Sequence, residues 1–95
     1  MKDSVVRGRL LQLLFERRAD APLPFGAAAG AIPPPAGIDE RAWLHALAEL
    51  SSHHLVNWTP ETNAAGAMGG FAEITDAGAD AYEGRVKPPI DLRFC

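Results

Sequence analysis

The residues of this chain whose chemistry suits metal binding are three histidines and one cysteine: His45, His53, His54 and Cys95. His53 and His54 are adjacent, so their side chains would point in different directions from a helix or a strand. The ligand spacing of a four-coordinate zinc site is absent. We therefore expect no metal ion, and no motif in the sequence indicates a cofactor.

Two short segments have residue types found in catalytic or phosphate-binding motifs. Residues 51–53 (Ser-Ser-His) place hydroxyls beside an imidazole, but a catalytic triad is assembled in space and needs a third group to orient the base. Residues 66–70 (Gly-Ala-Met-Gly-Gly) are not followed by the lysine and helix that a phosphate-binding loop requires. Cys95 has only Arg93 nearby to favour its thiolate. We expect a protein that is not an enzyme.

Length and composition indicate one globular domain without disulfides. The 95 residues are 47% hydrophobic, and the single cysteine excludes an internal disulfide bond. No apolar run approaches the roughly 20 residues that cross a bilayer, and the first residues lack the pattern of a secretory signal. We therefore expect a soluble cytoplasmic protein that does not bind membranes.

Charge is distributed unevenly along the chain. Residues 1–18 hold five basic and two acidic residues, and residues 85–95 hold three basic residues and one acidic residue. Residues 19–84 hold nine acidic residues and one basic residue, Arg41. The centre of the sequence is therefore strongly acidic, which bears directly on the kind of partner.

The N-terminal segment is predicted to be a helix from Ser4, acting as N-cap, to about Arg18. Helical spacing groups its apolar residues into an arc that looks too wide for a small domain to cover. Either this helix is sandwiched within the fold or it also packs against a second copy of the chain. Self-association as a dimer would use Val6, Leu10, Leu11 and Leu14.

The next segment is predicted to be a weak helix from Phe25 to Ile32, followed by a stiff turn over residues 33–37. Three consecutive prolines make this turn longer and more rigid than usual.

A second strong helical pattern begins at Asp39, a suitable N-cap, and extends to Leu50, with Trp43, Leu47 and Leu50 on one side. Two extended segments follow at residues 54–59 and 71–75. Between them, residues 59–70 are predicted to form a hairpin loop with a mobile, glycine-rich tip.

The C-terminal segment is predicted to be a short helix from Asp76 to Glu83, with Thr75 as N-cap and Gly84 at its end. Apolar and charged residues then alternate in a tail that could add a strand to the chain's own sheet or to a partner's. The apolar residues of this tail are Ile90, Leu92 and Phe94.

The order of elements from Ile38 to Glu83 resembles the recognition helix and hairpin wing of a winged helix-turn-helix domain. The segment Ile74 to Gly84 also resembles the way in which many such modules leave the wing and enter a final helix. The resemblance implies an α+β fold with a three-helix core, a two-stranded wing, a short fourth helix and an extended tail. Residues 1–84 would form the domain and residues 85–95 the tail.

The resemblance also implies DNA binding through the helix predicted at residues 39–50, which is the third helix of such a domain, with the wing touching the phosphate backbone. Four residues of this helix would face the duplex: Arg41, His45, Glu49 and Ser52. DNA affinity requires lysine or arginine at the contacting surface, whereas this surface offers one arginine among carboxylates and the loop adds Glu61 and no base.

The same acidic surface suits docking on a basic or apolar protein surface, including a second copy of the chain. The charge therefore favours a small regulatory or adaptor module that binds protein. The alternative is a DNA-binding transcription regulator that uses Arg41 and His45.

Overall fold

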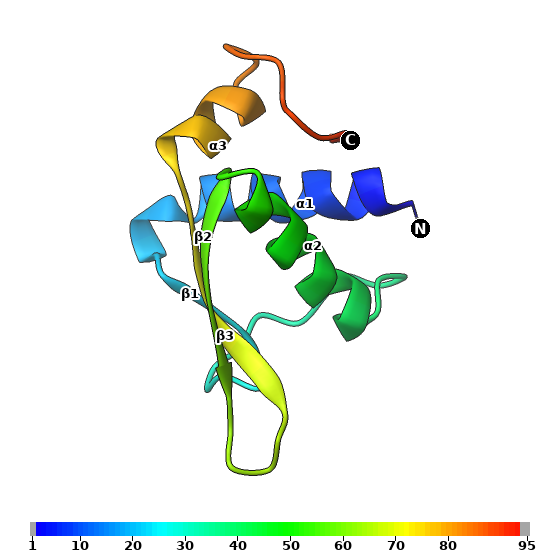
Figure 1. Cartoon of the computed structure of the whole chain (residues 1–95), viewed down its shortest axis with the longest axis vertical. Helices are drawn as coiled ribbons and strands as arrows, with labels where there is room; N and C mark the ends of the chain where they lie inside the picture. The colour runs from blue at the N-terminus through cyan, green and yellow to red at the C-terminus, as the bar shows by residue number, and fades with distance from the viewer. Residues whose placement is uncertain (1, 94–95) are drawn as a thin grey trace.

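The computed structural model describes residues 2–93 and has an α+β fold (Figure 1). Three α-helices and a three-stranded antiparallel sheet make up the described part of the chain. In chain order the elements are α1 (Asp3–Glu16), the 3₁₀ turn η1 (Arg18–Asp20), β1 (Leu23–Gly26), α2 (Glu40–Ser52), β2 (Val56–Thr62), β3 (Met68–Ile74) and α3 (Asp76–Tyr82).

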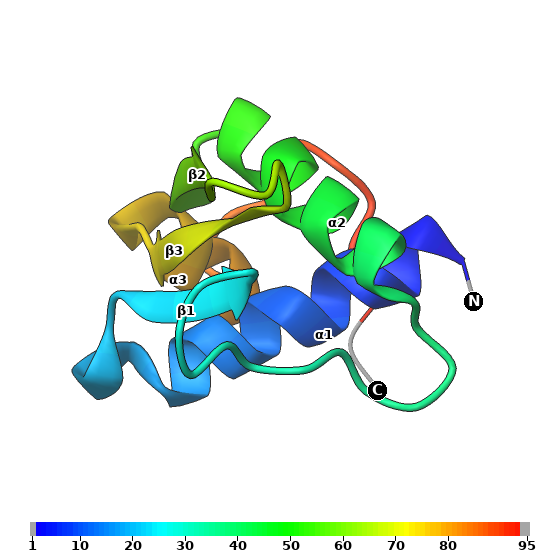
Figure 2. The same ribbon diagram turned by 90° about the horizontal axis from the view of Figure 1, so that it is seen from below.

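The sheet has the strand order β1-β3-β2, and both pairings are antiparallel. Leu23, Ala72 and Trp58 lie opposite one another across the three strands, so their side chains share one face. Both α1 and α2 lie on this inner face, as Figure 2 shows. The distal half of the β2–β3 hairpin extends beyond the helices, which makes the molecule elongated (Figure 1).

The expected self-association through α1 is wrong for the side chains that were expected to mediate it. Val6, Leu10, Leu11 and Leu14 are at most 3% exposed and lie in the core of the same chain. The wide apolar arc is covered because α2, β3, α3 and the tail pack around α1 from different sides. Of the two alternatives for this helix, the structure shows the sandwiched one.

The predicted second helix is also wrong. Phe25 and Gly26 belong to β1, and residues 27–39 form a loop in the place where a helix was expected. Gly26 and Gly30 have positive φ angles, of 65° and 72°, which are incompatible with a right-handed helix. The prolines that follow lack the N–H groups that would extend one. As a result the described core has three α-helices in all, including the short α3.

The hairpin is longer and its loop shorter than predicted, and the sheet has three strands in place of a two-stranded wing. Pairing continues past Pro60 to Thr62, which lies opposite Met68. Pro60 has no N–H group to donate, but it is tolerated because β2 is an edge strand of the sheet. The loop is closed by Asn63, whose Oδ1 accepts hydrogen bonds from the N–H groups of Ala65 and Ala67 at 2.9 and 3.0 Å.

Two of the predicted helix caps are confirmed. Asp39 accepts a 2.7 Å hydrogen bond from the N–H of Ala42, and Thr75 accepts one of 3.0 Å from the N–H of Gly78. The predicted cap at Ser4 is wrong, because α1 begins at Asp3 and Lys2, two residues before Ser4, occupies the N-cap position without a side-chain hydrogen bond.

The tail packs on its own domain. The N–H of Arg93 donates to the carbonyl oxygen of Ser4 at 2.9 Å, and Ile90 and Leu92 are partly buried against the core. Residues 85–93 form no strand, so the prediction that this stretch extends the chain's own sheet is wrong, and Phe94 lies outside the described residues. Gly8 permits this contact, because a Cβ atom there would collide with the carbonyl oxygen of Arg93.

Candidate functional site

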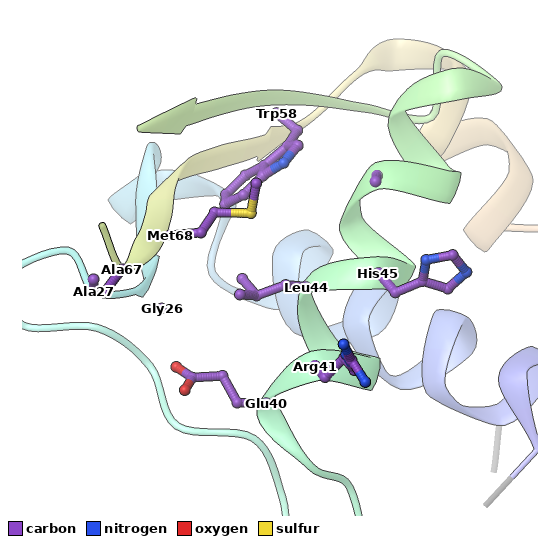
Figure 3. A pocket seen from close by; sticks show the side chains of 10 residues that line it. Gly26, Ala27, Glu40, Arg41, Leu44, His45, Trp58, Ala67 and Met68 are labelled. Atoms are coloured by element: carbon purple, nitrogen blue, oxygen red, sulfur yellow. The ribbon is translucent and has the colours of Figure 1, made fainter. Parts of the chain in front are cut away.

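A groove of about 600 Å³ lies between α2 and the β2–β3 hairpin (Figure 3). It forms because the sheet extends further than the helix that covers it. Its lining is mainly apolar and comes from three parts of the chain: Gly26 and Ala27 after β1; Glu40, Arg41, Leu44, His45 and Ala48 of α2; and Trp58, Ala67 and Met68 of the hairpin.

The floor of the groove is held by an aromatic cluster. The Trp58 ring lies edge-on to Phe25, with centroids 6.3 Å apart, and Phe25 also contacts Trp43 at 6.2 Å. Trp43 and Phe25 are buried, whereas Trp58 is only partly covered. The cluster therefore fixes one face of Trp58 and leaves part of its surface to the groove.

Met68 forms the far wall and is 53% exposed, the most exposed large apolar side chain in the described chain. It lies opposite Thr62 in the last pair of the ladder and shares the inner face with Trp58. In Figure 3, Leu44 extends from α2 toward the two hairpin side chains. Three large apolar side chains thus converge on an open space.

Charged groups lie on the α2 side of the groove. Glu40 extends toward the side where Gly26 and Ala27 lie, while His45 points away from Trp58 and Met68 (Figure 3). Glu40 and Arg41 form no ion pair with another residue in the range 2–93. Both charges are therefore available to a partner.

The four residues predicted to face a partner fall into two pairs. Arg41 and His45 line the groove. Glu49 instead accepts two 3.2 Å hydrogen bonds from Arg7 of α1, and its Oε1 lies 3.4 Å from Nε2 of His45. Ser52 donates a 2.7 Å hydrogen bond to the carbonyl oxygen of Glu49. Glu49 and Ser52 thus take part in contacts within the chain.

Three of the basic side chains are paired with carboxylates of the same chain. Arg7 pairs with Glu49, Arg17 with Asp20, and Arg85 with Asp80 and Glu83. The hydrogen bond that Arg85 donates to Asp80 and the charge of Glu83 raise the pKa of Arg85 above its ordinary value. Between Arg41 and Arg85 the chain contains no lysine or arginine, so the hairpin and most of α2 carry no positive charge apart from any on histidine.

The side chains that line the groove are mainly apolar. Within residues 2–93 there is no cluster of three or more His, Cys, Asp or Glu side chains that could hold a metal ion. The groove contains no hydroxyl or thiol side chain and one imidazole, that of His45, which points away from its centre.

Met68 was not among the residues predicted to face a partner. The available signal was the alternation Met68, Gly70, Ala72, Ile74, which continues the inner face of β3 past the end predicted for the strand. The glycines concealed this signal because they resemble loop residues.

None of the helices within residues 2–93 combines the length and the apolar character needed to span a bilayer. Comparisons of the chain with family models, with curated proteins and with solved structures found no match.

Proposed function

We propose that this chain is a small non-enzymatic regulatory or adaptor module that binds a protein partner through the face formed by α2 and the β2–β3 hairpin. The observation that carries this proposal is the combination of an open apolar groove with an acidic surround. The groove presents Leu44, Trp58 and Met68. Exposed tryptophan and methionine beside a concave surface are typical of protein interfaces.

The net charge of the elements that form this face argues against a polyanionic ligand. From Asp39 to Ile74, α2 with its cap, β2, β3 and their connections carry five carboxylates and one arginine. Arg7 offsets one of them, Glu49. Binding to a duplex requires neutralisation of several phosphates by lysine or arginine, and the net negative charge of these elements would repel them.

We also propose that the fold is a variant of the winged helix-turn-helix type. Its support is the order of elements, in which α2 is followed by the β2–β3 hairpin and then by the short α3. The variant would replace the second helix by the loop of residues 27–39. In this proposal the helix that other modules present to DNA is used for protein.

Titration with a duplex of random sequence at low salt tests the proposal. We expect no binding at micromolar protein, and a variant carrying both Glu61→Lys and Glu73→Lys should gain weak, salt-sensitive binding that shows the assay is responsive. Glu61 and Glu73 are exposed on the hairpin, so these changes should leave the fold intact. Micromolar or tighter binding by the unmodified chain, falling steeply with salt, would overturn the proposal.

The alternative reading, a transcription regulator, makes a distinct prediction for Arg41. If Arg41 read a base, Arg41→Ala would cost about 1–3 kcal/mol of discrimination between DNA sequences. We expect neither the unmodified protein nor the Arg41→Ala variant to discriminate measurably between DNA sequences.

A further inference from the structure

We propose that the groove between α2 and the hairpin binds a positively charged, amphipathic helical segment of a protein partner. Large apolar side chains of the segment would enter between Leu44, Trp58 and Met68, and a lysine or arginine would pair with Glu40. This inference rests on the proposed function and adds the chemistry of the partner to it.

The large apolar side chains of the proposed partner are inferred from the apolar side chains that remain exposed in the groove. Met68 and Val86 are the two large hydrophobic residues exposed in the described chain, at 53% and 49%. Met68 lies within a concave surface beside Trp58, whereas Val86 lies in the tail and does not line this groove. An unbranched methionine adapts to the shape of an apolar side chain, and a tryptophan fixed on one face offers a large rigid surface.

The positive charge of the proposed partner is inferred from carboxylates that have no ion-pair partner in the described chain. Glu40 lines the groove and has no ion pair within residues 2–93. Arg41 is the one Lys or Arg of α2 and the hairpin, and at the start of α2 it stands beside two carboxylates in sequence, Asp39 and Glu40, whereas Glu61 and Glu73 lie on the outer face of the hairpin. The excess of carboxylates favours a cationic segment, since charge complementarity raises the association rate and selects the partner.

The shape favours a segment of chain over a small molecule. A volume of about 600 Å³ lies within the range of ligand sites, but the groove runs open between a helix and a hairpin. Residues along α2 from Glu40 to Ala48 line it, a length of roughly two turns of helix. A helix laid in such a groove presents residues at i, i+3, i+4 and i+7 to one apolar surface.

Three synthetic peptides of about four helical turns test the inference in solution. The first carries leucine at i, i+3, i+4 and i+7 and lysine on its other face; the second replaces each lysine by glutamate; the third replaces each leucine by serine. Emission of Trp58 reports binding, because Trp43 is only 1% exposed. The variant Trp58→Phe should lack the change in emission, which identifies Trp58 as its source. Peptide binding to this variant can be followed through a label on the peptide.

We expect the lysine peptide to bind at micromolar concentration and the glutamate peptide to bind about tenfold more weakly or not at all. The serine peptide should not bind. Met68→Lys should remove binding of the lysine peptide, and Val86→Lys, a matched change at the other exposed apolar residue, should not.

The charge assignment has its own matched pair of variants. Glu40→Lys should weaken the lysine peptide by about threefold to tenfold and strengthen the glutamate peptide. Glu73→Lys makes the same charge change on the outer face of β3, opposite Asn57, and should alter either affinity by less than about twofold.

Three results would overturn the inference: equal binding of the lysine and glutamate peptides, binding that survives Met68→Lys, or occupation of the groove by a second copy. The last would appear as dimerisation in sedimentation that Met68→Lys abolishes. The proposed function would stand after any of these, because it is contradicted by tight, salt-sensitive binding to duplex DNA.

Discussion

The α1 region and the α2–hairpin region handle apolar surface in opposite ways. The arc of α1 is enclosed by α2, β3, α3 and the tail, and Val6, Leu10, Leu11 and Leu14 contact the chain's own core. The inner face of the hairpin is covered only as far as α2 extends, so Met68 and part of Trp58 remain open. The amount of apolar surface in a segment therefore does not indicate where a partner binds, because tertiary packing decides which part is covered.

The largest expected difference between the two regions is in stability. Leu10→Ala should lower the free energy of unfolding by about 2–5 kcal/mol, because it leaves a cavity at a side chain with 0% exposure. Met68→Ala should change it by less than about 0.5 kcal/mol. Chemical denaturation of both variants measures this contrast, and similar losses for the two would contradict the assignment of Met68 to an open surface.

The next effect concerns the tail. Gly8→Ala should displace residues 90–93 from α1, because the added Cβ collides with the Arg93 backbone. We expect a net loss of about 1–2 kcal/mol, since overpacking outweighs the gain in helix propensity. Hydrogen exchange should show faster exchange of the Arg93 N–H, which donates to Ser4 in the native fold.

Arg9→Ala is the control for this experiment, because Arg9 is exposed on the same helix. It should leave the exchange rate at Arg93 unchanged. A Gly8→Ala protein with a protected Arg93 amide would show that the tail lies elsewhere.

A smaller effect is expected from the contact that joins α1, α2 and the tail. Arg7 is 8% exposed, donates to both carboxylate oxygens of Glu49 and donates through Nε to the carbonyl oxygen of Asp91 at 3.0 Å. A double-mutant cycle with Arg7→Met and Glu49→Gln should give a coupling energy of about 1 kcal/mol. A coupling energy near zero would mean that the ion pair does not hold α2 against α1.

The smallest effect on stability should accompany the largest effect on binding. Met68→Lys and Val86→Lys should each change the free energy of unfolding by less than about 0.5 kcal/mol, because both side chains are about half exposed. Only Met68→Lys should affect binding of the cationic peptide. Equal effects of the two variants on binding would remove the distinction between groove and tail.

Local signals in the sequence were sufficient for part of this fold. The caps at Asp39 and Thr75 and the existence of α1, α2, α3 and the hairpin follow from residue types at fixed offsets. These features depend on neighbours a few residues apart, which a single sequence displays directly.

Features that depend on distant contacts were not predictable in the same way. β1 was missed because Pro22 and Pro24 flank Leu23, although an edge strand tolerates proline. The enclosure of α1 depends on a tail more than 80 positions away from Ser4, as the hydrogen bond from Arg93 shows. The groove lies where β3 extends beyond the part of the sheet that α2 covers. Its presence therefore depends on the relative placement of α2 and the sheet.

The claim that the α2–hairpin face binds protein is tested most directly by a photo-crosslinking residue placed at position 68, with position 86 as the matched control, in cells that produce the protein. We expect light-dependent adducts with another protein at position 68 that are absent or much weaker at position 86. Adducts with nucleic acid at position 68, or protein adducts of equal yield at both positions, would contradict it.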